Sequence, residues 1–129
     1  MIKIETGNIL NCSEDTIVHQ VNVQGIMGGG VAKQLALQYL GLEEDYAEHC
    51  RNLDNNYKHL RGNVFFYRGQ DNKIICNMFS QEKNFDTDYE AMKKALNYIK
   101  KWAENNNLSI AIPYRNRVWN SKWKLGKGI

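Results

Sequence analysis

Residues 16–40 constrain the fold of this chain more than any other segment. Residues 16–22 are rich in β-branched and apolar side chains and end on polar ones, which predicts a buried strand with a polar C-terminal end. A loop at residues 25–30 follows and contains three consecutive glycines. Residues 31–40 then place apolar side chains three to four positions apart, as an amphipathic helix does. A strand, a glycine loop and a helix in this order are typical of α/β folds.

The three glycines, Gly28, Gly29 and Gly30, need a reason, because glycine loses more conformational freedom on folding than any other residue. One reason is close approach of the backbone to a ligand at the helix N-terminus, where free N–H groups and the helix dipole favour an anion. The other is a plain tight turn without function. The segment matches neither the Walker A sequence nor the Rossmann G-x-G-x-x-G.

Strand and helix patterns alternate along the rest of the chain. A turn at residues 68–72 joins two of the strands as a hairpin, and Asp86 or Asp88 is expected to cap a long amphipathic helix that reaches about residue 104. This alternation predicts an α/β fold with a mixed central sheet and helices on both faces. Strands are expected at residues 2–5, 62–67, 73–79 and 108–113, a second helix at 43–50, and an apolar face of the long helix at Tyr89, Met92, Leu96, Ile99 and Ala103.

Charge and cysteine content exclude several function classes. The net charge of +3 comes from residues 114–129, which carry five basic residues and no acid; the other 113 residues carry 12 basic and 14 acidic side chains. Nucleic-acid binding would therefore rest on that tail alone. Cys12, Cys50 and Cys76 are odd in number and widely spaced, which predicts free thiols in a reducing cytoplasm and neither a disulfide nor a metal site. No apolar stretch is long enough to span a membrane.

The glycine loop and its flanks resemble the macro-domain family. Residues 18–32 read V-H-Q-V-N-V-Q-G-I-M-G-G-G-V-A and are similar, without a gap, to the family's V-N-A-A-N-x-x-x-x-x-G-G-G-V-A. The likeness is closest to phage and bacterial macro domains, yeast-type ADP-ribose-1''-phosphate phosphatases and terminal ADP-ribose glycohydrolases. Residues 7–9 are similar to the family's G-D-I, residues 89–92 to the start of its long helix, and residues 109–113 to its penultimate strand. The resemblance implies a three-layer α/β/α fold that holds ADP-ribose.

The resemblance also implies which residues contact the ligand. Asn22 would face the distal ribose, and residues 28–32 would wrap that ribose and the diphosphate. Asn8 stands where the family usually has an aspartate for the adenine amino group, and the N–H of Ile9 would lie beside it. No cofactor and no metal are implied. The expected ligand-binding residues are Asn8, Ile9, Asn22, Met27, Gly28, Gly29, Gly30, Val31, Ala32, Phe79 and Ser80.

The resemblance stops shortly after Pro113, where the family continues with a second phosphate loop, R-I-G-C-G-x-x-x-G-x-W, and a final helix. With synonymous codons chosen for residues 115–129 and one base removed after the first codon, the same bases spell R-I-G-C-G-I-A-N-G-N-W-E-K-V. We therefore divide the chain into a macro domain at residues 1–113 and a basic tail at 114–129. The tail is interpreted as the product of a one-base frameshift, the alternative being a divergent, selected tail. Such a domain would lack the normal C-terminal loop and helix.

Binding of ADP-ribose or a derivative is the first functional interpretation. Hydrolysis of ADP-ribose-1''-phosphate or of ADP-ribosyl conjugates is the alternative, although no nucleophile–base pair is visible. His19 is a candidate acid or base, and a structural hydrogen bond is the more ordinary role for a single histidine at a strand end. Nucleic-acid binding through Trp119 and Trp123 of the tail is a third interpretation. Self-association through sheet surface left uncovered by the altered C-terminus is expected as well.

Overall fold

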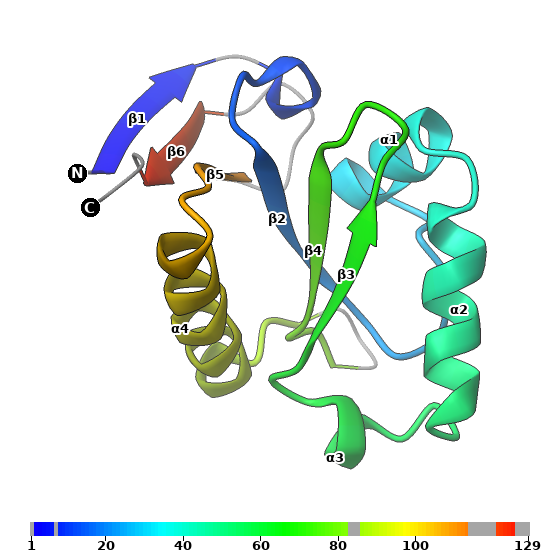
Figure 1. Cartoon of the computed structure of the whole chain (residues 1–129). Coiled ribbons are helices and arrows are strands. Elements are labelled where there is room, and N and C mark those ends of the chain that lie inside the picture. The colour runs from blue at the N-terminus through cyan, green and yellow to red at the C-terminus, as the bar shows by residue number, and fades with distance from the viewer. Residues whose placement is uncertain (1, 7, 83–85, 114–120, 126–129) are drawn as a thin grey trace.

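The computed structural model describes residues 2–6, 8–82, 86–113 and 121–125. Thr16–Val21 and Gly30–Gln38 are the strand and helix on either side of the glycine loop, as the sequence predicts. Figure 1 shows the whole chain, and its elements are named here as they are labelled there. The elements in chain order are β1 (Ile2–Thr6), the 3-10 helix η1 (Ile9–Asn11), β2 (Thr16–Val21), α1 (Gly30–Gln38), α2 (Leu42–Asn52), α3 (Tyr57–Leu60), β3 (Val64–Arg68), β4 (Ile74–Phe79), α4 (Tyr89–Asn105), β5 (Ile110–Pro113) and β6 (Ser121–Leu125).

These strands form one mixed sheet of six, in the order β1-β6-β5-β2-β4-β3. The central strand β2 is parallel to both β4 and β5, while β3 is antiparallel to β4. Because β2 and β4 run in the same direction and are in register from Thr16 opposite Ile74 to Val21 opposite Phe79, their carboxyl ends lie together. The loops that leave these two ends are therefore neighbours, although about 60 residues separate them in sequence.

Helices cover both faces of the sheet, with α1 and α2 on one side and α4 on the other (Figure 1). The alternation along β2 follows from the two-residue period of a strand: Ile17 and Val21 face α1 and α2, and Val18 faces α4. The same alternation holds in β4, where Ile75 and Phe79 face α1 and α2. Both faces of the central strands are thus buried, and the sequence of β4 is apolar except for Asn77, while β2 also contains Thr16, His19 and Gln20.

The long helix α4 differs from its predicted apolar face. Ala91, Ala95, Ile99 and Ala103 are its buried residues, a stripe in which every fourth side chain touches the sheet. Tyr89 is 73% exposed, so its assignment to the buried face was wrong. The buried face of α4 is rotated from the predicted one toward the alanines, because small side chains let the helix approach the sheet closely. Tyr89 is the first residue of the helix and lies outside that contact.

Three elements were not predicted from the sequence: η1, α3 and β6. The strand β6 lies between β1 and β5 and is antiparallel to both. Part of the segment set apart as a basic tail therefore belongs to the sheet, while residues 114–120 and 126–129 lie outside the described residues. The one element described after β5 is β6. The domain boundary at residue 113 and the frameshift stay predictions.

Candidate functional site

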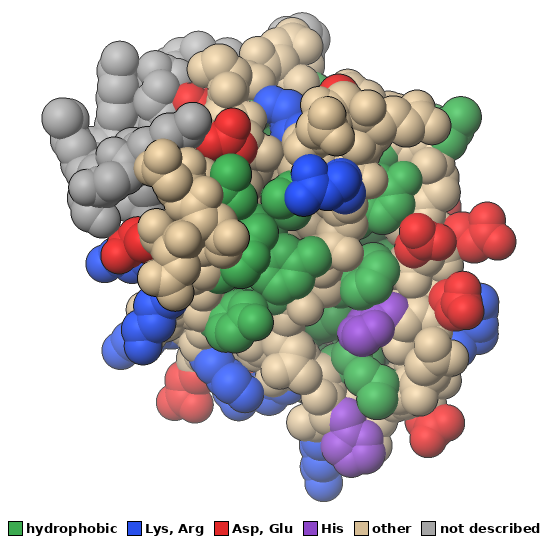
Figure 2. All heavy atoms as spheres, in the orientation of Figure 1, with side chains coloured by type: hydrophobic (Ala, Val, Ile, Leu, Met, Phe, Trp, Pro, Cys, Tyr) green, Lys and Arg blue, Asp and Glu red, His purple; other side chains and the backbone are tan. Residues whose placement is uncertain are grey.

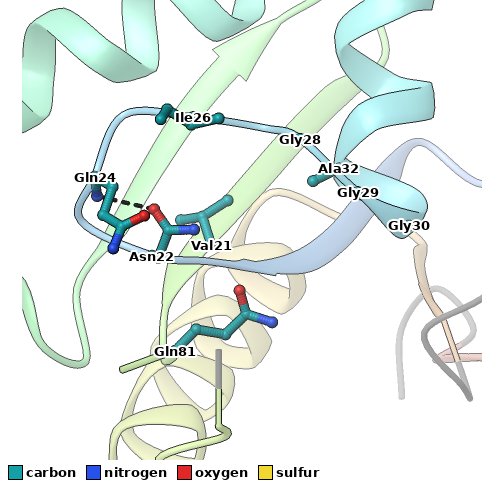
Figure 3. Close-up of a pocket in the computed structure, with 9 residues that line it drawn as sticks. All are labelled: Val21, Asn22, Gln24, Ile26, Gly28, Gly29, Gly30, Ala32 and Gln81. Atoms are coloured by element: carbon teal, nitrogen blue, oxygen red, sulfur yellow. Dashed lines mark hydrogen bonds between the residues drawn. The ribbon is translucent and has the colours of Figure 1, made fainter. Parts of the chain in front are cut away.

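A pocket of about 480 Å³ lies where the chain leaves β2 and enters α1. Figure 3 shows how its walls are arranged, with the end of β2 and the loop after it on one side, the start of α1 on another, and Gln81 reaching in from the segment after β4. The volume is in the range of small-molecule sites. The pocket is lined by Val21, Asn22, Gln24, Ile26, Gly28, Gly29, Gly30, Ala32 and Gln81.

Gly28 and Gly29 form a wall that the protein itself does not require to be glycine. Neither has a positive φ angle, so the backbone there suits any residue. A Cβ atom built on Gly29 would meet nothing within 4 Å, and one on Gly28 would only touch Ile26 at 3.4 Å. Gly30 is different, because its φ of 56° is a conformation that favours glycine. The bare surface of Gly28 and Gly29 therefore widens the pocket without serving the fold.

The N-terminus of α1 faces this pocket. The helix has nine residues, and its N-cap, Gly29, has no side chain to accept from the first N–H groups. The O atom of Gly29 accepts from Lys33 N at 3.1 Å, which is the first hydrogen bond of the helix. The N–H groups of the first turn have no partner within the helix, and the helix dipole adds partial positive charge there. This arrangement suits an anionic group such as a phosphate.

The second helix, α2, holds the loop between β2 and α1 in place. The hydroxyl of Tyr46 donates to the backbone O of Asn22 at 2.6 Å and lies 2.9 Å from its Oδ1. Met27 N donates to Glu43 Oε2 at 2.6 Å. Gly25, with a φ of 81°, runs so close to α2 that an added Cβ would lie 3.2 Å from the Cβ of Ala47. Tyr46 and Glu43 thus position the site, and the sequence analysis did not identify either.

Asn22 presents its amide nitrogen to the pocket. Its Oδ1 accepts from Gln24 N at 2.8 Å and lies 2.9 Å from the Tyr46 hydroxyl, whose single hydrogen it shares with the backbone O of Asn22 (Figure 3). That leaves Nδ2 as the group able to donate to a ligand, since no hydrogen bond of the described chain uses it. Burial of Asn22 at 5% exposure and these two bonds hold the amide in one orientation.

The segment after β4 closes the pocket from the opposite side. Gln81 N donates to the O atom of Val21 at 3.3 Å, which ties this segment to the end of β2. Ser80 is fully buried, and its hydroxyl donates to Gln20 Oε1 at 2.9 Å. Phe79 is also fully buried, in the core beneath α1 and α2. Neither Phe79 nor Ser80 lines the pocket, so the end of β4 supports Gln81 there.

The predicted ligand-binding residues divide into two groups. Asn22, Gly28, Gly29, Gly30 and Ala32 line the pocket together. The others do not line it: the side chains of Ile9, Met27 and Val31 are in the apolar core, and Asn8 is the N-cap of η1, where its Oδ1 accepts from Leu10 N at 3.0 Å. The pocket residues missed from the sequence are Val21, Gln24, Ile26 and Gln81. The polar end of β2 was the one signal that could have indicated Gln24.

His19 has the structural role that the sequence analysis weighed against catalysis. Its side chain is 4% exposed and does not line the pocket. Asn77 Nδ2 donates to Phe65 O at 2.8 Å, which turns Asn77 Oδ1 toward His19 Nε2 at 2.6 Å and makes Nε2 the protonated nitrogen. Burial lowers the pKa of His19 to about 4, even though the bond to Asn77 opposes that shift. The neutral ring therefore serves the fold.

The cysteines, possible metal ligands and helix lengths can be described for the same residues. Cys12, Cys50 and Cys76 are free and buried, as expected, and burial raises the pKa of the Cys50 thiol to about 11. Among the residues with described positions, no group of three acidic, histidine or cysteine side chains is placed to hold a metal ion. In those same ranges, the helices are too short or too polar for any of them to cross a bilayer.

Comparison with known proteins places these features in a family. No family model matches the chain. An ADP-ribose 1''-phosphate phosphatase of Saccharomyces cerevisiae (strain YJM789) is 34% identical over 98 residues, which cover 73% of this chain and 53% of the yeast protein. The chain thus spans about half the length of the curated relative that it matches.

Solved structures show the same fold. The macrodomain of Thermus aquaticus DarG superposes with a TM-score of 0.71 at 24% identity, covering 84% of this chain and 73% of that one. Thermosipho africanus DarTG, solved in complex with ADP-ribose, gives a TM-score of 0.62 at 15% identity over 80% of this chain and 30% of its own. The mixed sheet flanked by helices agrees with the fold of these structures, and with the sequence relative at 34% identity this shows that the chain is a member of the macrodomain family.

Proposed function

We propose that this macrodomain binds ADP-ribose or an ADP-ribose derivative in the pocket between β2 and α1. The observation that carries the proposal is the wall of Gly28 and Gly29, which is bare although neither the backbone angles nor the packing demands glycine. Two similar proteins support the choice of ligand: the yeast ADP-ribose 1''-phosphate phosphatase and Thermosipho africanus DarTG, which was solved in complex with ADP-ribose.

Each part of the ligand finds a suitable group in the pocket. The free N–H groups at the start of α1 suit the diphosphate. The Nδ2 of Asn22 and the amides of Gln24 and Gln81 suit ribose hydroxyls, because amides both donate and accept hydrogen bonds. Val21, Ile26 and Ala32 add apolar surface against which a sugar ring can lie. Like most small-molecule sites, the pocket is largely apolar and contains a few polar groups in fixed positions.

Calorimetric titration of ADP-ribose into the protein and into a Gly29→Ala variant tests the proposal. The added methyl group has open space around it in the unliganded protein, so the fold should tolerate it while the ligand loses room. We expect affinity to fall by about tenfold or more, the equivalent of roughly 1.4 kcal/mol. Leu37→Ala is the control, since Leu37 is on the same helix, 65% exposed and outside the pocket. Equal binding by Gly29→Ala and the unaltered protein would contradict the proposal.

A version that carries the frame-restored C-terminus serves as a reference in the same titration. Binding of ADP-ribose by both proteins would show that the glycine loop before α1 suffices. Binding by the restored version alone would show that the ligand needs donors from the second loop that the family resemblance implies. AMP is titrated in parallel, because preference for ADP-ribose over AMP separates this function from general nucleotide binding.

Hydrolysis of ADP-ribose 1''-phosphate or of ADP-ribosyl conjugates is the second candidate, and it is favoured by the yeast phosphatase relative. Against it, none of the nine described residues that line the pocket has an ionisable side chain. Binding without turnover is therefore our expectation. The measurement is release of inorganic phosphate from ADP-ribose 1''-phosphate, and release that disappears in Gly29→Ala would favour the hydrolase.

We further infer a cytoplasmic protein of phage or bacterial type. Three free, buried cysteines support a reducing compartment, and the sequence likeness supports the origin.

Self-association through the sheet surface near the altered C-terminus stays a proposal, as does nucleic-acid binding through residues 114–129. Light scattering after gel filtration tests the first. Retention on a heparin column at rising salt tests the second.

A further inference from the structure

The strand β3 is an edge of the sheet, because it pairs with β4 on one side and is last in the strand order. Gly69 N donates to Lys73 O at 2.8 Å, and Phe79 N donates to Asn63 O at 3.0 Å. These bonds place the odd-numbered residues of β3 in the hydrogen-bonded pairs with β4. The backbone N–H and C=O groups of Val64, Phe66 and Arg68 therefore point away from the sheet, toward a strand that could be added.

A groove of about 570 Å³ runs beside this edge, between α2 and α4. Figure 2 shows hydrophobic side chains gathered at the centre of this face, with basic, acidic and histidine side chains around them. The groove is separate from the pocket described above, since the two share no lining residue. It is lined by His49 and Leu53 of α2, by Gly62, Asn63, Val64 and Phe66, and by Lys94, Asn97, Tyr98 and Lys101 of α4.

Basic groups and no acidic ones line this groove. Lys94 and Lys101 are seven residues apart on α4, which puts them on the same face of the helix about two turns from each other. The stem of Lys94 lies over Gly62, where an added Cβ would be 2.7 Å from the lysine Cδ. Two ammonium groups on α4, two turns apart beside the edge strand, favour an occupant that is extended and carries negative charge.

The aromatic residues of β3 beside the groove pack against side chains of α4 and α2. Phe66 contacts Trp102, with ring centroids 4.7 Å apart, and Tyr98, at 6.2 Å. On the other side, His49 stacks on Phe65 at 4.8 Å. The ring of Phe66 is therefore already covered by α4, and it offers an apolar edge more than a free face for stacking. A nucleobase needs the free face, whereas an aliphatic side chain needs only the edge.

We propose that the edge of β3 is a docking site for an extended acidic peptide segment of another protein. The peptide would add a strand to the sheet through the backbone groups of Val64, Phe66 and Arg68. Its side chains alternate between the two faces of the sheet, so acidic residues on the α4 face pass Val64 and Phe66 and reach Lys94 and Lys101. The apolar residues between them face the α2 side, toward His49 and Leu53. A second copy of this chain fits less well, because pairing two β3 edges would bring like-charged lysines together.

Fluorescence anisotropy with a labelled seven-residue peptide of alternating glutamate and valine, blocked at both ends, tests this site. We expect saturable binding that weakens by about tenfold in a Lys94→Glu, Lys101→Glu double variant. Lys100→Glu is the matched control, because Lys100 is exposed on the same helix and outside the groove. The same peptide with a central proline should not bind, since proline cannot donate to a strand pair.

Several outcomes would overturn the proposal. Equal binding of the proline peptide would exclude strand addition, and equal weakening by Lys100→Glu would reduce the effect to general charge. Tighter binding of a ten-nucleotide oligothymidylate, lost in the same double variant, would make the groove a nucleic-acid surface. Unchanged circular dichroism of each variant excludes unfolding as the cause. Gly29→Ala should leave peptide binding intact, so failure of the ADP-ribose proposal would not affect this one.

Discussion

At the scale of single residues, His19 and Asn77 show how a polar pair is accommodated within an apolar layer. The pair sits between β2 and β4, beneath α1 and α2, and each of its three bonded atoms has a fixed role. His19 Nδ1 has no hydrogen-bond partner and is fully enclosed. A proton placed on it would have to be buried without compensation, which is why the ring stays neutral.

This pair makes stability depend on pH. The pKa of His19 is about 4 in the folded protein and ordinarily about 6.5, so the unfolded chain binds the proton more readily. The contribution of His19 is thus fully present above pH 6.5 and is lost as pH falls toward 4. We expect a loss of about 2 kcal/mol between pH 7.5 and pH 5. Urea unfolding at both pH values measures it, with His19→Gln as the variant that lacks the titration.

Other titrating groups affect both proteins alike, so the difference between them isolates His19. The free energy of unfolding of the unaltered protein should fall toward that of His19→Gln as the pH decreases. Parallel pH profiles would show that folding does not lower the pKa of His19.

The residue scale also shows what the sequence could not reveal about the site. The motif identified Asn22 and the three glycines, because their types are distinctive at that spacing. Gln81 joins them only because β4 lies beside β2, a contact between residues far apart in the chain. Tyr46 and Glu43 support the loop from α2 through bonds to Asn22 and Met27. Nothing in their local sequence distinguishes them from ordinary helix residues.

At the scale of elements, the stability of α4 depends on its N-cap residue, Asp88. Asp88 accepts from Ala91 N at 3.1 Å, from Tyr57 at 2.8 Å and from Arg61, which joins α3 to the start of α4. The hydrogen bonds from Arg61 hold the pKa of Asp88 near 2, so the carboxylate contributes stability above about pH 4 and loses it as pH falls toward 2. The sequence predicted Asp86 or Asp88 as the cap, and the structure shows Asp88.

Replacing this residue in two ways separates the cap from the charge. Asp88→Ala should lower the midpoint of thermal unfolding by about 5 °C, because cap and ion pair are both lost. Asp88→Asn keeps a capping oxygen and should cost less. Glu90→Ala is the control: Glu90 is also near Arg61 but its side chain is 91% exposed, so its removal should change the midpoint little. Differential scanning calorimetry ranks the three, and a larger effect of Glu90→Ala would contradict this account.

The elements also separate what sequence patterns can and cannot predict. Strands β2 and β4 were evident because both are rich in β-branched and other apolar residues and are buried on both faces. The buried stripe of α4 was misjudged at Tyr89, since a helical period alone does not distinguish a stripe of alanines from an adjacent stripe of larger side chains. Strand β6 had no apolar run of its own, and it depends on β1 and β5 for its place. Pairing with strands that are distant in the sequence leaves no pattern in the local sequence of β6.

At the scale of the whole molecule, the two sites occupy different parts of one sheet. The pocket opens where β2 and β4 end, and the groove follows the free side of β3. They are connected by a short path, because Gly62 N donates to Phe79 O at 2.9 Å and Gln81 follows two residues later. A peptide on β3 and a nucleotide in the pocket could therefore be bound together, as their lining residues do not overlap.

The position of β1 has a consequence for the rate of folding. Among the described strands β1 pairs only with β6, and Thr6 lies opposite Ser121, so this contact closes a loop of more than a hundred residues. The β3–β4 hairpin, by contrast, closes across a few residues. Closure entropy grows with loop length, and contacts of high sequence separation slow folding. Pulse-labelled hydrogen exchange during refolding should show amides of β3 and β4 protected first and those of β1 last. Between these two events the chain would be a nearly complete domain in which β1 has not yet paired with β6.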